Sequence, residues 1–398
     1  MASEGMVAPG NARSALIALN TSIPVMIFSV TRLSIVIAAA TAMGLNPAQT
    51  TALIVGLYVV PGVLTLVLTA IYRQPFMMGW STPVIIFLAS VGAQATYPEI
   101  LGAMIVAGIV VTAIGVFGLS SRLASLVPAP IIFGLLAGMV LPFIVRIFND
   151  VGAHPVMIGG LVIGFLVGRR LLEPRIPAIV VALVVGLLIA GFTGNINGAP
   201  GGWSFPELTL IAPSFSTSAI LMIVPVVVVV ILAQGNLPSI VYLESQDYRP
   251  PKRVLDIVSG VGTSIGSLIG AVPVSMGSMV MPLFAGPDAG PRATRHWAVY
   301  VVGFGLIMVA LLASIAAHLP SVVPISLLLA VAGLALLPVL GQALTAVTSG
   351  PLRLGPLLAF VVAVSELTLF GLGPLFWALV TGMGVSLLLE SNELRQLR

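Results

Sequence analysis

The stretch Pro75-Phe-Met-Met-Gly-Trp80 interrupts an apolar run where a membrane helix would continue, and Pro273-Val-Ser-Met-Gly277 repeats its outline 198 residues later. Proline lacks the backbone N–H that a helix needs, and glycine weakens helical continuity. Each motif therefore predicts an extended stretch that gives way to a short helix. One such motif alone is compatible with a kink in an ordinary helix, but two at equivalent positions favour a paired, non-helical element.

The composition predicts a membrane protein. Of the 398 residues, 59% are hydrophobic and only 7% are charged, which is outside the range of soluble domains. Apolar runs long enough to cross a bilayer as helices recur along the chain, and the alternating strand pattern of a membrane barrel is missing. Cysteine is absent, so disulfides and thiolate chemistry are excluded. Residues 1–13 are polar and precede a run too long for a signal peptide, so no cleavable leader is expected.

We predict an all-α polytopic membrane protein with fourteen transmembrane segments. The third and tenth segments hold the two motifs and are too short and too rich in glycine and proline to be ordinary spans. With a cytoplasmic N-terminus, every Lys and Arg except Arg32 and Arg146 lies in a cytoplasmic loop, as the positive-inside rule requires, and the C-terminus is also cytoplasmic. The predicted segments are 14–41, 51–72, 75–92, 98–120, 125–147, 155–170, 175–194, 218–243, 254–270, 273–284, 297–317, 321–341, 353–370 and 373–390.

The two halves of the chain align with each other. A shift of 204 residues pairs Pro47 with Pro251, and a shift of 198 pairs Met78 with Met276. A unit of seven segments is odd-numbered, so the second unit enters the membrane from the opposite side and the chain forms a 7+7 inverted repeat. Secondary transporters of this architecture bind substrate near the membrane midplane, where interrupted segments of the two halves meet. Two half-helix N-termini at that point would suit an anion.

Several function classes lack the residues that they need. The basic residues are scattered and form no patch for a nucleic acid. His154, His296 and His318 lie at loop ends without helical spacing to acidic residues, so neither a metal site nor a cofactor is predicted. An intramembrane enzyme is not expected, because the sequence shows no nucleophile and base at helical spacing. A transporter and a channel both remain, and a channel would pass currents far above the turnover of a carrier.

Polar residues near the two motifs are the candidates for substrate binding. Gln234 and Asn236 lie late in the eighth segment, where polar side chains serve either function or helix contacts. Arg32 lies deep in the first segment and aligns with Asn236; it receives a substrate carboxylate, acts as a structural counter-ion or extends to the membrane surface. The motif residues offer hydroxyls and backbone N–H groups beside apolar walls, although serines also bond within helices and Trp80 can simply pack. They are Met78, Gly79, Trp80, Ser81, Ser275, Met276, Gly277 and Ser278.

Glu366 is the acidic residue most plainly inside a predicted span, the thirteenth. Burial in a membrane favours the protonated form of a carboxyl group, so Glu366 is the sequence's candidate for carrying a coupling proton. Its position near the outer end of that span equally suits a contact at an entrance or an interface.

Five sets of residues are informative when they are taken together. They are Arg73-Gln-Pro75 with Ser81-Thr-Pro83, Ala233-Gln-Gly-Asn-Leu-Pro238, Gly286-Pro-Asp-Ala289 with Trp297, Ala332-Gly-Leu-Ala-Leu-Leu337, and Leu369-Phe-Gly-Leu-Gly-Pro-Leu-Phe-Trp377. As a set they resemble the benzoate permease (BenE) family over nearly the whole chain. The resemblance implies a secondary transporter that imports an aromatic carboxylate such as benzoate by proton symport and alternating access across the bacterial inner membrane.

The fold of that family, which uracil and xanthine permeases share, implies a core domain and a gate domain with the substrate between them, often in a homodimer. On this chain the core domain would comprise 14–120 and 218–320, and the gate domain 121–194 and 321–390, with an outer loop at 195–217. The partners implied are the anion, a proton and the lipid bilayer, with no nucleic acid. A nucleobase or another small anion is the alternative substrate, although the glutamates that nucleobase relatives carry in segments 8 and 10 are missing.

Overall fold

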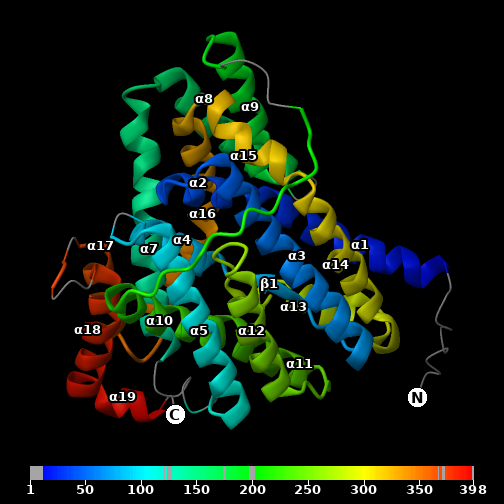
Figure 1. Cartoon of the computed structure of the whole chain (residues 1–398), viewed down its shortest axis with the longest axis vertical. Coiled ribbons are helices and arrows are strands. Elements are labelled where there is room, and N and C mark those ends of the chain that lie inside the picture. Colours follow the sequence, from blue (N-terminus) through cyan, green and yellow to red (C-terminus); the bar gives the residue numbers. More distant parts are fainter. Residues whose placement is uncertain are drawn as a thin grey trace.

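The computed structural model describes residues 12–92, 94–120, 122, 128–173, 176–196, 202–365, 367–369 and 373–396. This part of the chain is mostly helical, and its only sheet consists of two three-residue strands. Helices surround that strand pair near the centre of the molecule (Figure 1). Glu366 lies outside the described residues, so its role as a proton carrier stays a prediction.

The described elements follow the predicted segments closely in order. The first half contains α1 (Ala12–Thr31), α2 (Leu33–Ala42), α3 (Pro47–Tyr72), β1 (Met78–Trp80), α4 (Thr82–Val91), α5 (Tyr97–Phe117), α7 (Ala129–Val151), α8 (Pro155–Val167), η1 (Gly168–Leu172) and α9 (Ala178–Phe192). The second half contains α10 (Thr217–Val229), η2 (Val230–Asn236), α11 (Leu237–Ser245), α12 (Lys252–Gly266), β2 (Val274–Met276), α13 (Met281–Ala285), η3 (Pro287–Ala289), η4 (Arg292–Thr294), α14 (His296–Ala310), α15 (Ala313–Val322), α16 (Ile325–Thr348), α17 (Leu354–Val364), α18 (Pro374–Leu389) and α19 (Ser391–Gln396).

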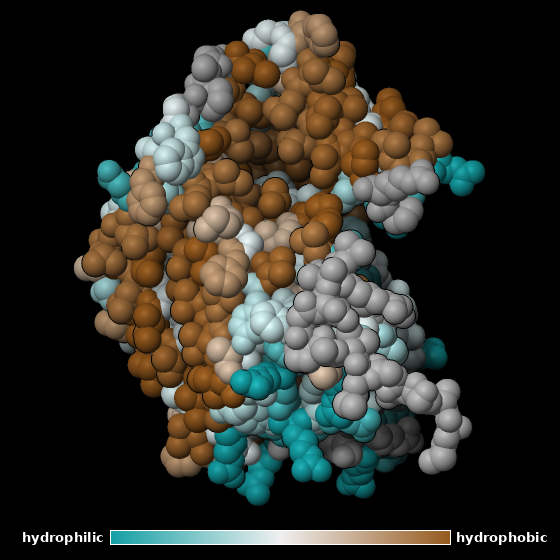
Figure 2. Space-filling view, turned by 90° about the vertical axis from the view of Figure 1, so that its right-hand side faces the viewer, coloured by the Kyte–Doolittle hydropathy of each residue, from teal (hydrophilic) through white to brown (hydrophobic). Residues whose placement is uncertain are grey.

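The outer surface is that of a membrane protein. Eight stretches of the described chain are long and apolar enough to cross a bilayer as helices, and α4, α9, α17 and α18 are apolar but shorter. Apolar side chains cover most of the face in Figure 2, whereas hydrophilic side chains gather at its lower end. Soluble proteins do not expose so continuous an apolar surface. The chain is therefore a multi-pass membrane protein, while the count of fourteen spans stays a prediction.

Both Pro-x-x-Met-Gly motifs form strands, and the two strands pair. β1 and β2 run antiparallel, with Met78 opposite Met276. The N–H of Ser81 donates to the carbonyl of Pro273 at 2.9 Å and extends the pairing beyond the last residue of β1. A short helix follows each strand, α4 after β1 and α13 after β2. The predicted change from extended chain to short helix is thus confirmed at both motifs.

The predicted segment 14–41 corresponds to one apolar stretch, Ala18–Ala42, that is long enough to cross a membrane, and this stretch is interrupted at Arg32. α1 ends at Thr31 and α2 begins at Leu33, with Arg32 in the turn between them. The segment 218–243 is also irregular, because the π-helix η2 ends at Asn236. A hydropathy profile does not reveal either irregularity, because the residues on both sides are as apolar as those of a regular membrane helix. Such local departures from the α-helix often occur at functional sites.

A second boundary differs near residue 320. The sequence predicts a joint between the segments 297–317 and 321–341, but α15 runs across it with Pro320 inside. The joint lies slightly later, at Val323 and Pro324, and a further break occurs at Leu311 and Leu312, whose N–H groups donate to carbonyls three residues back at 3.1 and 3.0 Å. Two leucines give an apolar window no sign of a turn, which explains why the sequence does not predict the break at Leu311 and Leu312.

The helices form two packed groups. Beside the strands, α5 packs against α10 and α12, and α14 packs against α1 and α3. In the other group, α7 packs against α16 and α17, α17 packs against α18, and α8 packs against α9. Gly108 on α5 and Gly260 on α12 allow a close approach of these two helices, because a side-chain carbon at either position would collide with the facing backbone. α4 lies against α7 and therefore at the contact between the groups.

The connection 202–216 contains no helix or strand and lies along the ends of the helices beside it. The N–H of Ser214 donates to the carbonyl of Pro98 at 2.9 Å, and the indole N–H of Trp203 donates to the carbonyl of Leu311 at 2.8 Å. In Figure 1 this green segment crosses the front of the molecule.

Candidate functional site

Threonines on two helices hold the backbone of the strand pair. On α3, the hydroxyl of Thr65 accepts from the N–H of Met78 at 2.9 Å and donates to the carbonyl of the same residue at 3.1 Å. On α12, the hydroxyl of Thr263 accepts from the N–H of Val274 at 2.9 Å. Non-helical backbone in a membrane protein must find such partners, because no lipid group can supply them. The strands are therefore built into the protein rather than loosely inserted.

Arg32 extends from the turn between α1 and α2 to the end of β1. Its guanidinium carbon lies 3.6 Å from the centroid of the Trp80 ring and 5.3 Å from that of Phe28. One terminal nitrogen donates to the carbonyl of Trp80 at 2.8 Å and to the hydroxyl of Thr82, the first residue of α4. Its Nε is buried and has no hydrogen-bond partner in the described part of the chain. Arg32 thus brings a positive charge and an unused donor to the start of α4.

Tyr58 on α3 supports the same tryptophan. Its ring meets that of Trp80 edge to face, with centroids 6.1 Å apart. Its hydroxyl donates to the carbonyl of Ser29 on α1 at 2.6 Å, and its side chain is fully buried. Trp80 is therefore fixed between a cation and an aromatic edge, a restraint that the sequence analysis did not anticipate.

Asn236 joins α12 to β2. Its side-chain oxygen accepts from the N–H of Met276 at 3.0 Å, and its side-chain nitrogen donates to Asp256 at 2.9 Å and to Ser259 at 3.0 Å. Both amide donors and the amide oxygen are thus occupied, and the residue is only 1% exposed. In this conformation Asn236 holds β2 in position.

Gly235 brings η2 against β2, and Gln234 beside it carries a buried donor. A side-chain carbon at Gly235 would lie 2.6 Å from Cβ of Ser275, so only glycine allows this approach. The side-chain nitrogen of Gln234 is buried and lacks a hydrogen-bond partner in the described part of the chain. An unpaired buried donor costs free energy, of about 1 to 3 kcal/mol, unless a ligand or water completes it.

The remaining predicted residues surround the strand pair to different degrees. Gly79 pairs with Ser275, and no atom lies within 4 Å of the point where a side chain at Gly79 would begin, so space is open there. Ser81 and Ser275 are buried. The N–H of Gly277 donates to the carbonyl of Met77 at 2.9 Å, and Ser278 follows in a half-buried turn. The predicted residues therefore meet around β1 and β2, with Ser278 at their edge.

Asp256 is a buried acidic residue that the sequence analysis did not single out. One carboxylate oxygen accepts from Asn236, and the other accepts from the hydroxyl of Ser120, just beyond α5. Its side chain is 2% exposed. Because Asp256 follows Lys252 and Arg253 so closely, the sequence suggests that it is a charged residue on the surface. The missed signal is spacing: Asp256, Ser259 and Thr263 recur at intervals of three and four, which places them on one face of α12.

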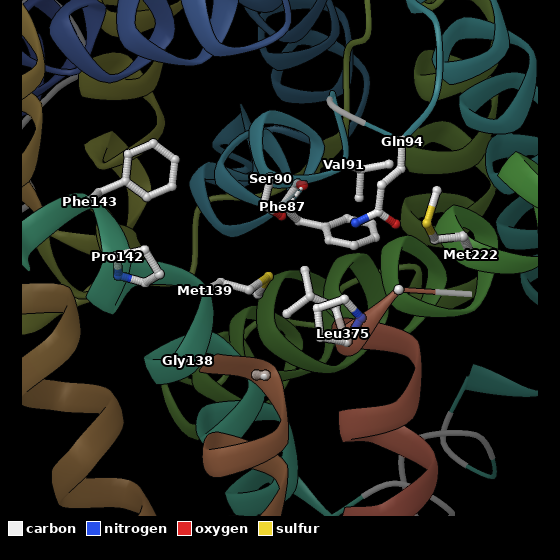
Figure 3. A pocket seen from close by; sticks show the side chains of 13 residues that line it. Phe87, Ser90, Val91, Gln94, Gly138, Met139, Pro142, Phe143, Met222 and Leu375 are labelled. Atoms are coloured by element: carbon white, nitrogen blue, oxygen red, sulfur yellow. Dashed lines mark hydrogen bonds between the residues drawn. The ribbon is translucent and has the colours of Figure 1, made fainter. Parts of the chain in front are cut away.

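A cavity lies along α4, between the two helix groups (Figure 3). It contains about 460 Å³ of atom-free space, part of which is open to the outside. The ring of Phe87 and the side chains of Met139, Met222 and Leu375 face it together, with the amide of Gln94 at one edge (Figure 3). Its lining residues, none of which was predicted from the sequence, are Phe87, Ser90, Val91, Gln94, Gly138, Met139, Pro142, Phe143, Met222, Ala363, Gly373, Pro374 and Leu375.

Known proteins match this chain over most of its length. The sequence model of the family described as "Benzoate membrane transport protein" (BenE) matches residues 12–388. The "Inner membrane protein YdcO" of Escherichia coli (strain K12) is 28% identical over 346 residues, which cover 86% of this chain and 88% of that protein. The "Benzoate membrane transport protein" of Acinetobacter baylyi is 25% identical over 314 residues, which cover 78% and 79%.

Solved structures share the fold at low sequence identity. The transmembrane domain of a cyanobacterium bicarbonate transporter, BicA, has a TM-score of 0.62 and 14% identity, covering 94% of this chain and 98% of that one. SLC26A9 has a TM-score of 0.64 and 12% identity, covering 94% and 65%. Likeness at these identities establishes the arrangement of helices and leaves the substrate to be argued from the site itself.

Proposed function

Because the chain belongs to the BenE family of benzoate membrane transport proteins, we propose that it imports a small aromatic carboxylate, with benzoate as the first candidate, together with a proton. The relative from Acinetobacter baylyi is named for benzoate transport. The fold is shared with structures named as bicarbonate and anion transporters. The chain is thus a membrane transporter of small anions and not an enzyme. That the substrate is aromatic and that a proton moves with it are the parts that we propose.

The observation that carries this proposal is the guanidinium of Arg32 beside the start of α4. A carboxylate is attracted both by an arginine with an unused donor and by the N-terminal end of a helix. Open space at Gly79 and the Trp80 ring offer room and an apolar face for an aromatic acid. We assign the carboxylate to this point, with the other proposed contacts around it: Met78, Ser81, Gln234, Asn236, Ser275, Met276, Gly277 and Ser278.

The cavity along α4 supplies a route to that point. Its largely apolar lining suits an aromatic ring, and Ser90 and Gln94 add polar atoms to that lining. Phe87 stands five residues after Thr82, so the cavity and the start of α4 are about 8 Å apart along the helix axis. In the proposed mechanism the substrate passes between the two helix groups and along α4.

The finer architecture is part of the proposal. Fourteen segments would form a 7+7 inverted repeat in the bacterial inner membrane, with both termini in the cytoplasm. Thr65 and Thr263 support the repeat, because they stand 198 residues apart and each bonds to the strand of its own half. Arg32 and Asn236 also support it, because they stand 204 residues apart and each is at a helix irregularity.

Transport would then proceed by alternating access. The helices around β1 and β2 form the core domain, predicted at 14–120 and 218–320. This domain moves against a gate domain at 121–194 and 321–390, which contains α7, α16 and α17. A homodimer through the gate domain completes the proposed assembly.

A second candidate is a permease of the same fold for another small anion or a nucleobase. The charge of Arg32 favours any small anion over a neutral base, so the anion is the stronger alternative. A channel remains the more distant one.

The test is uptake of radiolabelled benzoate by proteoliposomes containing the purified full-length protein, with and without an inward proton gradient. We expect gradient-driven accumulation in the wild type, at least a ten-fold loss in Arg32→Ala, and little change in Arg146→Ala, a half-exposed arginine paired with Asp150. Absence of benzoate flux in the wild type, together with uptake of another anion, would refute the aromatic substrate. Currents far above carrier turnover would establish a channel.

A further inference from the structure

Two carboxylates are buried in the described part of the chain, and their partners differ in kind. Glu390 accepts from the N–H groups of Arg353, Leu354 and Gly355 at 2.6, 2.7 and 3.0 Å. Backbone N–H groups can only donate, so this site favours the ionised carboxylate. Asp256 instead faces the hydroxyl of Ser120, which can donate or accept. Glu390 also accepts from the hydroxyl of Ser386 at 2.9 Å, but its three backbone N–H donors hold it ionised, whereas the hydrogen-bond partners of Asp256 in the described chain are all side chains.

Asp256 can take up a proton with only a rotation of the Ser120 hydroxyl. When it is ionised, Ser120 donates to one carboxylate oxygen and Asn236 donates to the other at 2.9 Å. When a proton binds the first oxygen, that O–H donates to the oxygen of Ser120, and the hydroxyl of Ser120 rotates away. The bond from Asn236 remains in both states. Ser120 is half-buried, so it also connects this buried carboxylate with the surface.

A short hydrogen-bonded chain links Asp256 to the proposed substrate site. Asn236 donates to Asp256 with its nitrogen and accepts from the N–H of Met276 on β2 with its oxygen, at 3.0 Å. A hydrogen bond to an ionised group is roughly twice as strong as one between neutral groups. Protonation of Asp256 therefore changes how firmly Asn236 is held and, through it, the position of β2.

The other charged and titratable groups near this part of α12 lie on α12 itself, on the helices packed beside it and in the chain after α5. Lys252 pairs with Glu244 of α11 at 2.8 Å, and Arg253 lies against Gly118. Arg122 follows Ser120 in the chain, α3 carries Tyr58 and Tyr72, and α5 carries Tyr97 and Glu99 at its opposite end. The hydrogen-bond partners of the Asp256 carboxylate in the described chain, Ser120 and Asn236, are both neutral.

We propose that Asp256 carries the proton that moves with the substrate, and that Asn236 transmits its protonation state to β2. The inference rests on the proposed function, since it names the proton carrier of the same transport. An anion at the strand pair binds better when Asp256 is neutral, because a like charge nearby in a medium of low dielectric constant has been removed. Substrate and proton then promote each other's binding, as symport requires.

The experiment compares wild type, Asp256→Asn and the matched control Asp247→Asn in proteoliposomes. Asp247 is exposed and lies outside the proposed site. Three quantities are measured: benzoate accumulation driven by an inward proton gradient, exchange of internal for external benzoate at equal pH, and the pH dependence of benzoate affinity. Exchange needs binding and conformational change but no net proton movement, so it separates a lost proton carrier from a damaged site.

In Asp256→Asn we expect accumulation to fall at least ten-fold, exchange to stay within about three-fold of wild type, and benzoate affinity to lose its dependence on pH. The control should resemble wild type in all three. Accumulation in Asp256→Asn equal to that of wild type would overturn the inference. Loss of exchange in a variant that melts at the wild-type temperature would also overturn it, because that outcome marks a structural role.

Ser120→Ala provides a second test in case Asp256→Asn fails to fold. Loss of the hydroxyl that donates to the ionised carboxylate should shift the pH profile of uptake toward higher pH. An unchanged profile would contradict the inference. The wild-type measurements separate the two proposals: absent benzoate flux refutes the proposed substrate, whereas proton-coupled wild-type uptake that Asp256→Asn retains refutes only the assignment of Asp256.

Discussion

The guanidinium carbon of Arg32 lies 3.6 Å from the centroid of the Trp80 ring, and the same side chain donates to the Trp80 carbonyl at 2.8 Å. An arginine can do both at once because its guanidinium is planar: the face stacks while the edge donates. The cation is thereby fixed on two sides. Its buried Nε, which has no partner in the described chain, remains for a ligand.

Arg32→Lys should reduce benzoate uptake about ten-fold although it keeps the charge, because an ammonium group cannot stack on the ring and donate in its plane. A loss of that size corresponds to about 1.4 kcal/mol. Initial uptake rates over a range of benzoate concentrations measure it, with Arg146→Lys as the matched control. Uptake within two-fold of wild type would show that charge alone suffices.

Gly235→Ala should abolish most transport, because the added methyl group would lie 2.6 Å from Cβ of Ser275 and must push η2 away from β2. The hydrogen bond between Asn236 and Met276 would lengthen as a result. Gly384→Ala is the control, since no atom lies within 4 Å of the corresponding point there. Uptake and melting temperature are measured for both variants. Wild-type uptake in Gly235→Ala would mean that the contact between η2 and β2 is dispensable.

Leu375→Trp should slow transport at least ten-fold by filling part of the cavity along α4. Leu387→Trp, on the same helix but 53% exposed, introduces the same side chain on the outer surface and should leave transport unchanged. Uptake rates of the two variants are compared at equal protein content. Equal uptake rates of the two variants would show that the substrate does not pass through the cavity.

Glu390→Ala should destabilise the protein by about 2 to 3 kcal/mol, because it leaves three N–H groups at the start of α17 without their acceptor. Burial raises the pKa of Glu390, but the N–H groups of Arg353, Gly355 and Leu354 and the hydroxyl of Ser386 outweigh it, so the pKa lies below its ordinary value of 4.5. A lowered pKa means that ionisation favours the folded state.

The contribution of Glu390 is therefore fully present above pH 4.5 and is lost as the pH falls through the lowered pKa. Melting temperatures in detergent between pH 7 and pH 3 test this. The difference between wild type and Glu390→Ala should shrink as the pH falls below 4.5, whereas Glu207→Ala, an exposed residue, should track wild type throughout. A difference that is constant with pH would contradict the assigned charge.

The sequence predicts the elements that depend on local chemistry. Proline and glycine at Pro75, Gly79, Pro273 and Gly277 mark the two strands, because those residues act on the backbone directly. The turn at Arg32 escapes prediction because it depends on what the side chain can reach, namely Trp80 and α4.

The sequence predicts that the site lies around the two strands, but it does not predict the contacts that hold the strands in place. Asp256 is 136 residues from Ser120 and 20 from Asn236, and only the packing of α5 and η2 on α12 brings the three together. The cavity along α4 has the same origin, since its lining comes from five helices and the chain flanking two of them. Composition carries no information about such distant contacts, and the sequence points to Glu366 instead, because that carboxyl group is conspicuous within its own predicted span.

The pairing of β1 with β2 has a consequence for biosynthesis. Met276, the partner of Met78 in the strand pair, is translated 198 residues after it. The pairing of β1 with β2 therefore cannot form until Met276 has been made. During that interval Thr65, on the preceding helix, can already satisfy the N–H and carbonyl of Met78. The Thr65 hydroxyl would then replace hydrogen-bond partners that β1 lacks while only the first half has been inserted. Nascent chains that end before β2 cannot form the site.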